Sequence, residues 1–251
     1  MSGLVATGIV GGYAAADEVV RGVTLSAAAG ELTCVIGPNG AGKSTALKLV
    51  AGLLRPRQGI VMLEGRDLSG LPPRAALTAG LVFVPQERNI FAALSVEENL
   101  LMGGYATGLT GGYAAGRAAL DEAYANFPAL RARRRTAAGS LSGGQRQVLA
   151  MASALMARPR ALLLDEPTAG LSPQAAAELL ALIQRLARAG LAILMVEQNA
   201  TEALAASDRA AVMVDGRVVR DGPAAEVAGD PEIRRLFLGG RAHPSTEGQA
   251  A

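Results

Sequence analysis

The sequence predicts an α/β fold with a mixed sheet, an antiparallel β attachment and an inserted α-helical subdomain. Three observations lead to this prediction. Short, almost wholly apolar runs alternate with segments of helical periodicity, which is typical of parallel strands joined by crossover helices. Two further segments carry a glycine turn between alternating residues, which favours antiparallel hairpins. A long middle section has no strand signal and is rich in alanine, leucine and arginine.

Four apolar runs are the expected strands of the core. Each run is short and nearly free of polar residues, as strands buried on both faces of a sheet must be. One crossover helix is well marked over 172–190, because Ser172 can cap its start, Pro173 fits its first turn and Gly190 can end it. The predicted strands are 32–36, 81–84, 161–164 and 191–196.

The remaining segments set the domain organisation. Hairpins are expected at 61–67 and 211–219, where Glu-Gly and Asp-Gly turns occur. We predict a single domain over 1–240, followed by a small, polar stretch that has nothing to bury. The predicted ranges are 1–90 and 158–240 for the α/β core, 91–157 for the helical subdomain, and 241–251 for a flexible tail.

Composition excludes several classes of function. The chain has 251 residues, half of them apolar, which is enough for a sizeable core. A net charge of +2 with 18% charged residues gives no broad basic face for nucleic acid. The single cysteine, Cys34, excludes an intrachain disulfide, and we expect it to pack in a buried strand. No apolar run approaches the roughly 20 residues that span a bilayer. If the protein acts at a membrane, we therefore expect it to lie outside the bilayer.

A phosphate-binding loop is predicted at 37–45, between an apolar strand and a helix. Its spacing is Gly, four residues, Gly-Lys and Ser. Backbone N–H groups and the helix N-terminus would bind phosphate oxygens, Lys43 would reach the β and γ phosphates, and Ser44 would bind Mg²⁺. A glycine-rich turn that matches by chance is the alternative, which the flanking strand and helix disfavour. The predicted core is that of a P-loop NTPase of RecA-like type, and the loop alone leaves open kinases, GTPases, helicases and transport motors. The candidates for binding the nucleotide are Gly37, Pro38, Asn39, Gly40, Ala41, Gly42, Lys43, Ser44 and Thr45.

Two carboxylates follow the predicted strand 161–164. Asp165 can hold Mg²⁺, and Glu166 can accept the proton of the water that attacks the γ-phosphorus. The alternative is a pair of N-capping residues before the turn at Pro167. The phosphate loop favours the catalytic interpretation, because a bound Mg²⁺ needs a further oxygen ligand from the protein.

The pentapeptide Leu-Ser-Gly-Gly-Gln at 141–145 lies between these two motifs. Ser142 and Gln145 have the spacing of a capping box at the start of a helix that runs to 157, and such an N-terminus can bind an anion. The pentapeptide resembles the signature of the ABC ATPase family. That resemblance implies a head-to-tail dimer with two ATPs between the subunits, in which Ser142, Gly143, Gly144 and Gln145 contact the partner's nucleotide.

Other residues follow in the family's order, over about 4–239. Gln86 resembles the glutamine that senses Mg²⁺ and links to the permease, and Tyr13 resembles the aromatic residue that stacks on adenine. Residues 169–172 resemble the loop through which the two subunits communicate.

The chain departs from the family at one position. Where the family commonly has a histidine that contacts the γ-phosphate, this chain has Gln198. Glutamine can donate a hydrogen bond but cannot carry a proton, so we assign the base role to Glu166.

Segments 83–88 and 196–200 resemble those of LivF-type ATPases of branched-chain amino acid importers. The resemblance implies that a second, different ATPase pairs with this one beneath permease subunits, at the cytoplasmic face of the inner or plasma membrane. A solute-binding protein would deliver the solute, and Ile90, Phe91 and Leu94 are candidates for the permease contact. Urea or short-amide importers and lipopolysaccharide export are the alternatives. ABC ATPases of DNA repair or translation are disfavoured, because the chain has neither heptads nor a second cassette.

Overall fold

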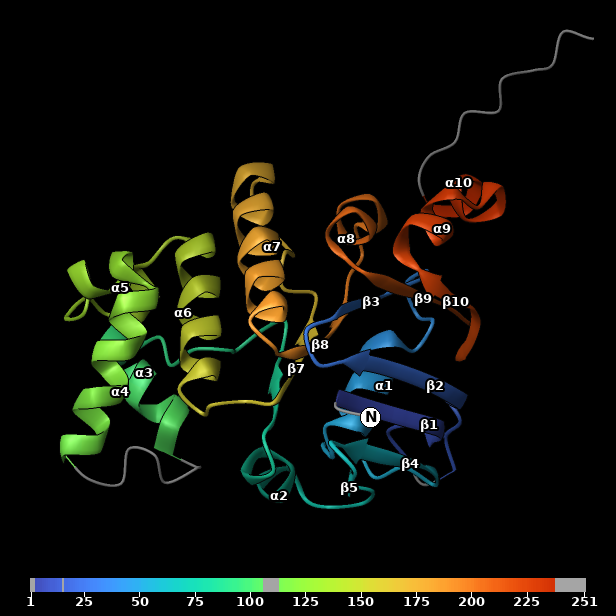
Figure 1. Cartoon of the computed structure of the whole chain (residues 1–251), viewed down its shortest axis with the longest axis horizontal. Helices are drawn as coiled ribbons and strands as arrows, with labels where there is room; N and C mark the ends of the chain where they lie inside the picture. The colour runs from blue at the N-terminus through green and yellow to red at the C-terminus, as the bar shows by residue number, and fades with distance from the viewer. Residues whose placement is uncertain (1–2, 15, 106–112, 238–251) are drawn as a thin grey trace, which may run out of the picture.

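The computed structural model describes residues 3–14, 16–105 and 113–237, and its centre is a mixed six-stranded sheet (Figure 1). Strands β6, β7, β8, β3 and β9 pair in parallel, while β10 pairs antiparallel with β9 at one edge. The strand order is β10-β9-β3-β8-β7-β6. The bounds are β3 (Leu32–Ile36), β6 (Leu81–Val84), β7 (Ala161–Asp165), β8 (Ala192–Val196), β9 (Arg209–Val214) and β10 (Arg217–Pro223).

A separate antiparallel sheet has the order β2-β1-β4-β5. Its strands are β1 (Gly3–Gly11), β2 (Val20–Ala28), β4 (Gln58–Leu63) and β5 (Arg66–Asp67). Sequence analysis found only the β4–β5 hairpin of this sheet. The glycines of β1 obscured its pattern, and the pairing of β1 with β2 shifts register next to Gly8.

The second predicted hairpin, at 211–219, forms as β9 and β10 but does not belong to the attachment. It is the edge of the central sheet, because β9 pairs in parallel with β3. Its turn residues Asp215 and Gly216 both have positive φ, 46° and 76°, as the turn of a two-residue hairpin requires. The predicted fold class, with a mixed sheet and an antiparallel attachment, is confirmed.

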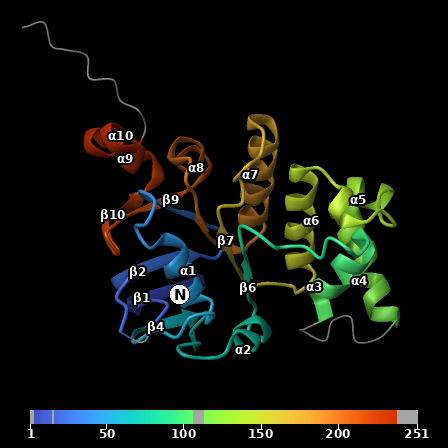
Figure 2. The same ribbon diagram turned by 180° about the vertical axis from the view of Figure 1, so that it is seen from behind.

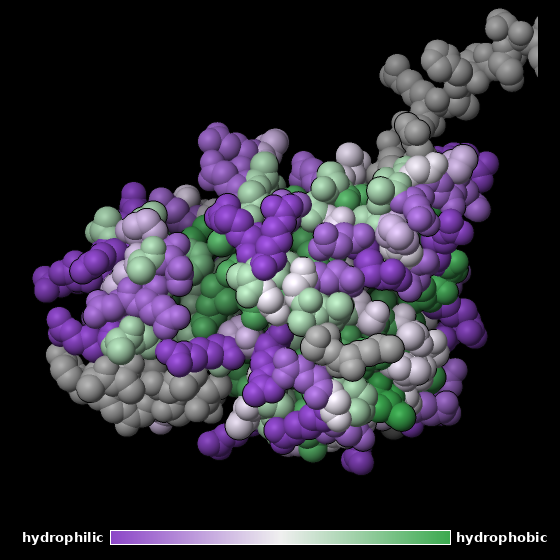
Figure 3. Space-filling view, viewed as in Figure 1, coloured by the Kyte–Doolittle hydropathy of each residue, from purple (hydrophilic) through white to green (hydrophobic). Residues whose placement is uncertain are grey.

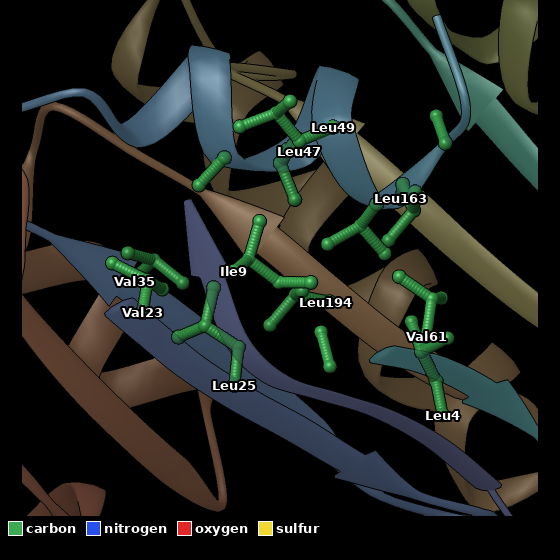
Figure 4. Packing of buried hydrophobic residues seen from close by; sticks show 14 of the residues in the cluster. Leu4, Ile9, Val23, Leu25, Val35, Leu47, Leu49, Val61, Leu163 and Leu194 are labelled. Carbon is green, nitrogen blue, oxygen red and sulfur yellow. The ribbon is translucent and has the colours of Figure 1, made fainter. Parts of the chain in front are cut away.

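The central sheet is buried on both faces, which explains its apolar strands. Figure 4 shows Ile9, Val23 and Leu25 of the antiparallel sheet packed near Val35 and Leu194 of the central sheet. Helix α1 (Lys43–Val50) adds Leu47 and Leu49 to the same cluster. The other face packs on α7 (Pro173–Arg188), α8 (Ala200–Ala206) and α9 (Ala224–Gly229), which are followed by α10 (Pro231–Phe237).

Cys34 lies on this second face and is fully buried. Burial raises the pKa of its thiol to about 11, which agrees with a packing role. The N-cap predicted for α7 is present, since the Ser172 hydroxyl accepts a hydrogen bond from the Ala175 N–H.

Helices α3–α6 lie at one end of the molecule, away from the antiparallel sheet (Figures 1 and 2). They form a cluster of their own around Leu100, Tyr124 and Leu149. Helix α6 also joins the central core through Ala150 and Met151. The bounds are α3 (Val96–Tyr105), α4 (Tyr113–Asn126), α5 (Pro128–Ala132), the 3₁₀ turn η1 (Ala138–Ser140) and α6 (Gly143–Leu155), while α2 (Pro73–Thr78) precedes β6.

None of the helices in the described part of the chain is both long and apolar enough to cross a membrane. The predicted tail at 241–251 lies outside the described residues.

Candidate active site

The phosphate loop connects β3 to α1 and borders a cavity of about 500 Å³. Residues 39–45 line it, together with Tyr13, Val19, Glu166 and Gln198. Gly42 is the N-cap of α1, has φ of 92° and makes no side-chain cap, so the first amides of the helix stay available to an anion. The size and lining suit a nucleotide.

The end of β9 and the turn that follows it contact the phosphate loop and support it. The Gly216 N–H donates to the Ala41 carbonyl at 3.0 Å. A Cβ atom built on Gly37 would lie 2.1 Å from the Met213 carbonyl oxygen, so only glycine fits there. Sequence analysis did not find this contact, because it joins residues that are far apart in the chain.

Lys43 is 5% exposed and points into the loop. Its ammonium donates to the carbonyls of Gly37 and Pro38, at 2.8 and 3.1 Å. An ammonium has three N–H donors, so it can also serve a phosphate oxygen. Burial lowers the pKa of Lys43, and the negative charges of Glu166 and Asp165 oppose this shift.

Ser44, which lines the cavity, contacts Asp165 at the end of β7. The Ser44 hydroxyl donates to Asp165 Oδ1 at 2.7 Å, although 121 residues separate the two. Asp165 is 5% exposed at the end of β7. A hydroxyl and a carboxylate at this distance are an oxygen pair that fits Mg²⁺, which takes one or two carboxylates and completes its shell with phosphate and water.

Glu166 borders the cavity one residue after Asp165 and has a φ of 46°. Positive φ is uncommon for residues other than glycine and is concentrated at functional sites. The Gln86 amide donates from Nε2 to Glu166 Oε2 at 3.0 Å, so the structure brings these two predicted residues together. Gln198 follows β8 and lines the same cavity.

Tyr13 is 63% exposed beside the loop. Lys48 Nζ donates to its hydroxyl at 3.3 Å and lies 5.6 Å from the ring centroid. Hydrogen bonding with Thr45 lowers the pKa of Tyr13; burial opposes this shift, and the contact with Lys48 adds to it. The open ring can offer a face to a base.

The four signature residues are elsewhere. Ser142 caps α6, accepting from the Gln145 N–H at 3.4 Å and donating its own N–H to Gln145 Oε1 at 3.1 Å, so the predicted capping box is present. A Cβ built on Gly144 would lie 3.2 Å from the Ala175 side chain, and Gly143 faces Leu171. Among the described residues that line the cavity at the phosphate loop, none of these four signature residues is present.

A family model described as "ABC transporter" matches residues 20–169, more than half of the chain. The chain belongs to the ABC transporter family. This ABC ATPase is 39% identical to the high-affinity branched-chain amino acid transport ATP-binding protein BraG of Pseudomonas aeruginosa, over 89% of this chain and 94% of that protein. It is 43% identical to the probable branched-chain amino acid transport ATP-binding protein LivF of Archaeoglobus fulgidus, over 83% and 87%.

A third relative of the ABC ATPase is the lipopolysaccharide export system ATP-binding protein LptB of Acidithiobacillus ferridurans. It is 37% identical over 88% of this chain and 90% of that protein. A crystal structure of the ADP conformation of an ATP-binding cassette of an ABC transporter matches with a TM-score of 0.82 at 27% identity, over 96% and 100% of the two chains. The chain is thus the ATP-binding, ATP-hydrolysing subunit of an ABC transporter.

Sequence analysis of this ABC ATPase missed Glu197, which is the most deeply buried acidic side chain near the site. It is 2% exposed and accepts hydrogen bonds from Thr168. The available signal was a glutamate directly after an apolar strand.

Replacing Tyr13 by Ala is expected to weaken ATP binding. Stacking of an aromatic ring on a base contributes about 1–3 kcal/mol, so Kd should rise about 5- to 150-fold. Titration of the full-length chain with ATP measures the change. Tyr13→Phe keeps the ring and loses the Lys48 contact, so it should bind nearly as the unaltered protein does. Equal losses in both variants would contradict stacking.

Proposed function

We propose that this ABC ATPase drives the import of branched-chain amino acids through separate permease subunits. The observation that carries the proposal is the similarity to BraG and LivF, whose names state branched-chain amino acid transport. Gln198 in the phosphate cavity agrees with it, because the segment around this residue resembles LivF-type ATPases.

Within the site, each side chain has a proposed role that follows from its position. The phosphate loop and Lys43 bind the phosphates, and Tyr13 stacks on the adenine. Ser44, Asp165 and, through its carbonyl, Gln86 would hold Mg²⁺, which neutralises phosphate charge when it is bound.

The proposed catalytic step uses two further side chains at the same cavity. Glu166 accepts the proton of the attacking water, while Gln86 holds its carboxylate in place. Gln198 donates an amide hydrogen to the γ-phosphate.

A second ATPase subunit, which we take to be a different chain, would complete the site. The Ser142 end of α6 has a satisfied cap and lies outside the cavity of its own chain, which supports a contact with the partner's ATP. We retain the division into a core (1–90, 158–240) and a helical subdomain (91–157) as part of this proposal.

The permease contact is proposed for a second cavity, of about 300 Å³, between β6 and the helices α3 and α6. It is mostly apolar and is lined by Leu53, Phe83, Asn89 and Gly103, among others. Figure 3 shows apolar residues between the helical end and the centre of the molecule. Of the three predicted contact residues, Phe91 is 55% exposed, whereas Ile90 packs against two buried clusters. None of Ile90, Phe91 and Leu94 is among the described residues that line this cavity, so all three remain predicted permease contacts.

The expected location is the cytoplasmic face of the inner or plasma membrane, held there by the permease, with a solute-binding protein as an indirect partner. The test is uptake of radiolabelled leucine, isoleucine or valine by proteoliposomes that contain the whole transporter. Uptake should require ATP on the side of the membrane where this subunit lies, and it should cease in the Glu166→Gln variant.

Lipopolysaccharide export is the second candidate, favoured by the 37% identity to LptB. In that case the same vesicles would take up no amino acid, and ATP hydrolysis would respond to lipopolysaccharide. Stimulation by urea or short amides alone would instead point to the remaining importer class.

A further inference from the structure

Glu197 lies where three strands of the central sheet end. It follows β8 directly, and its backbone N–H donates to the Val35 carbonyl of β3 at 3.2 Å. The phosphate loop begins just after β3, and Glu166 follows β7. One residue therefore touches the segments that carry the loop, the base and the γ-phosphate contact.

The Glu197 carboxylate binds two of these segments through its two oxygens. Oε1 accepts from the Thr168 N–H at 3.0 Å and from the Thr168 hydroxyl at 2.8 Å. Oε2 accepts from the N–H of Gln198 at 3.2 Å. Thr168 is two residues after Glu166, whose own N–H donates to the Val196 carbonyl at 2.9 Å.

This carboxylate is costly to bury. Burial raises the pKa of Glu197, the negative charge of Glu166 adds to the shift, and the three hydrogen bonds oppose it. No Lys or Arg forms an ion pair with it among the described residues. If this side chain served only to fill space, an apolar residue could do so without the free-energy cost of burying a charge.

We propose that Glu197 is a positioning residue for ATP hydrolysis, which fixes the Gln198 backbone against the Thr168 segment so that Gln198 faces the γ-phosphate beside Glu166. It acts through Gln198 and does not contact the reacting atoms. The proposal rests on the roles given to Gln198 and Glu166 above. It adds a residue that holds Gln198 in position relative to Glu166.

Glu197→Gln is the main test, in the full-length chain purified together with its transporter subunits. The amide keeps the shape of the side chain but must turn its NH₂ group toward a backbone N–H, either of Thr168 or of Gln198. We expect kcat to fall about 10-fold or more, with KM for ATP within about threefold of the unaltered value. An unchanged kcat would overturn the proposal.

A double variant separates positioning from a general structural role. If Glu197 acts through Gln198, adding Glu197→Gln to Gln198→Ala should lower kcat no further than Gln198→Ala alone. Losses that multiply would overturn the proposal. Glu202→Gln is the matched control, because it removes a carboxylate from the neighbouring helix α8 and should leave kcat unchanged. An equal loss in this control would assign the effect to charge alone.

Variants of Thr168 decide the matter if Glu197→Gln does not fold. Thr168→Ser keeps the hydroxyl that donates at 2.8 Å, whereas Thr168→Val removes it at nearly the same volume. The serine variant should retain kcat and the valine variant should lose it, with similar melting temperatures. The same kcat in both would refute the proposal. A transporter that hydrolyses ATP but imports no amino acid would refute the proposed solute and leave this inference intact.

Discussion

Glu166→Gln is expected to bind ATP normally and to lose turnover by about 100- to 10,000-fold, the usual contribution of a general base. Glutamine has almost the same shape as glutamate, and its carbonyl can still accept the hydrogen bond from Gln86. It cannot accept the proton of the attacking water. ATP binding by calorimetry and phosphate release at saturating ATP measure the two parts of this prediction.

A matched control for this variant is Glu178→Gln on α7, which changes the same chemical group at an exposed position. It should leave both ATP binding and turnover unchanged. Turnover near the unaltered rate in Glu166→Gln would remove Glu166 from the base role and direct attention to Gln198 and its neighbours.

Gly37→Ala is expected to abolish ATP binding. The added methyl group would lie 2.1 Å from the Met213 carbonyl oxygen, so either the phosphate loop or β9 must move. Overpacking of this kind costs about 1–3 kcal/mol of folding stability, and the displaced loop no longer presents its amides to phosphate. ATP titration and thermal unfolding measure the two effects.

Gly222→Ala provides the comparison for this prediction. Gly222 has no atom within 4 Å of its built Cβ and is not among the residues with positive φ. The protein with this change should bind ATP as the unaltered protein does. Unchanged ATP affinity in Gly37→Ala would mean that the loop tolerates a shift of its first residue.

Local sequence was sufficient for the elements that carry strong short-range signals. The core strands, the α7 cap, the glycine turns and the capping box at Ser142 all form as predicted, because each depends on residues within a few positions of one another. The phosphate loop and the acidic end of β7 were predicted for the same reason. Their meeting through Ser44 and Asp165 was inferred from chemistry and is present in the structure.

Contacts between distant residues were not available from one sequence. Strands β1 and β2 depend on pairing with each other and carry interrupting glycines, so no local pattern marked them. The place of β9 beside β3 is a topological fact that a hairpin signal does not contain. Glu197 was missed because its partner Thr168 is 29 residues away and its burial results from the packing of the whole sheet.

The support that Gly216 and Met213 give to the phosphate loop has a consequence for biosynthesis. The ribosome makes the loop more than 170 residues before it makes the residues of β9 and the following turn that contact the loop. A ribosome-bound chain that stops before β9 therefore carries the complete glycine motif without the backbone that shapes it. Competence to bind nucleotide is therefore expected only after β9 and β10 have been made.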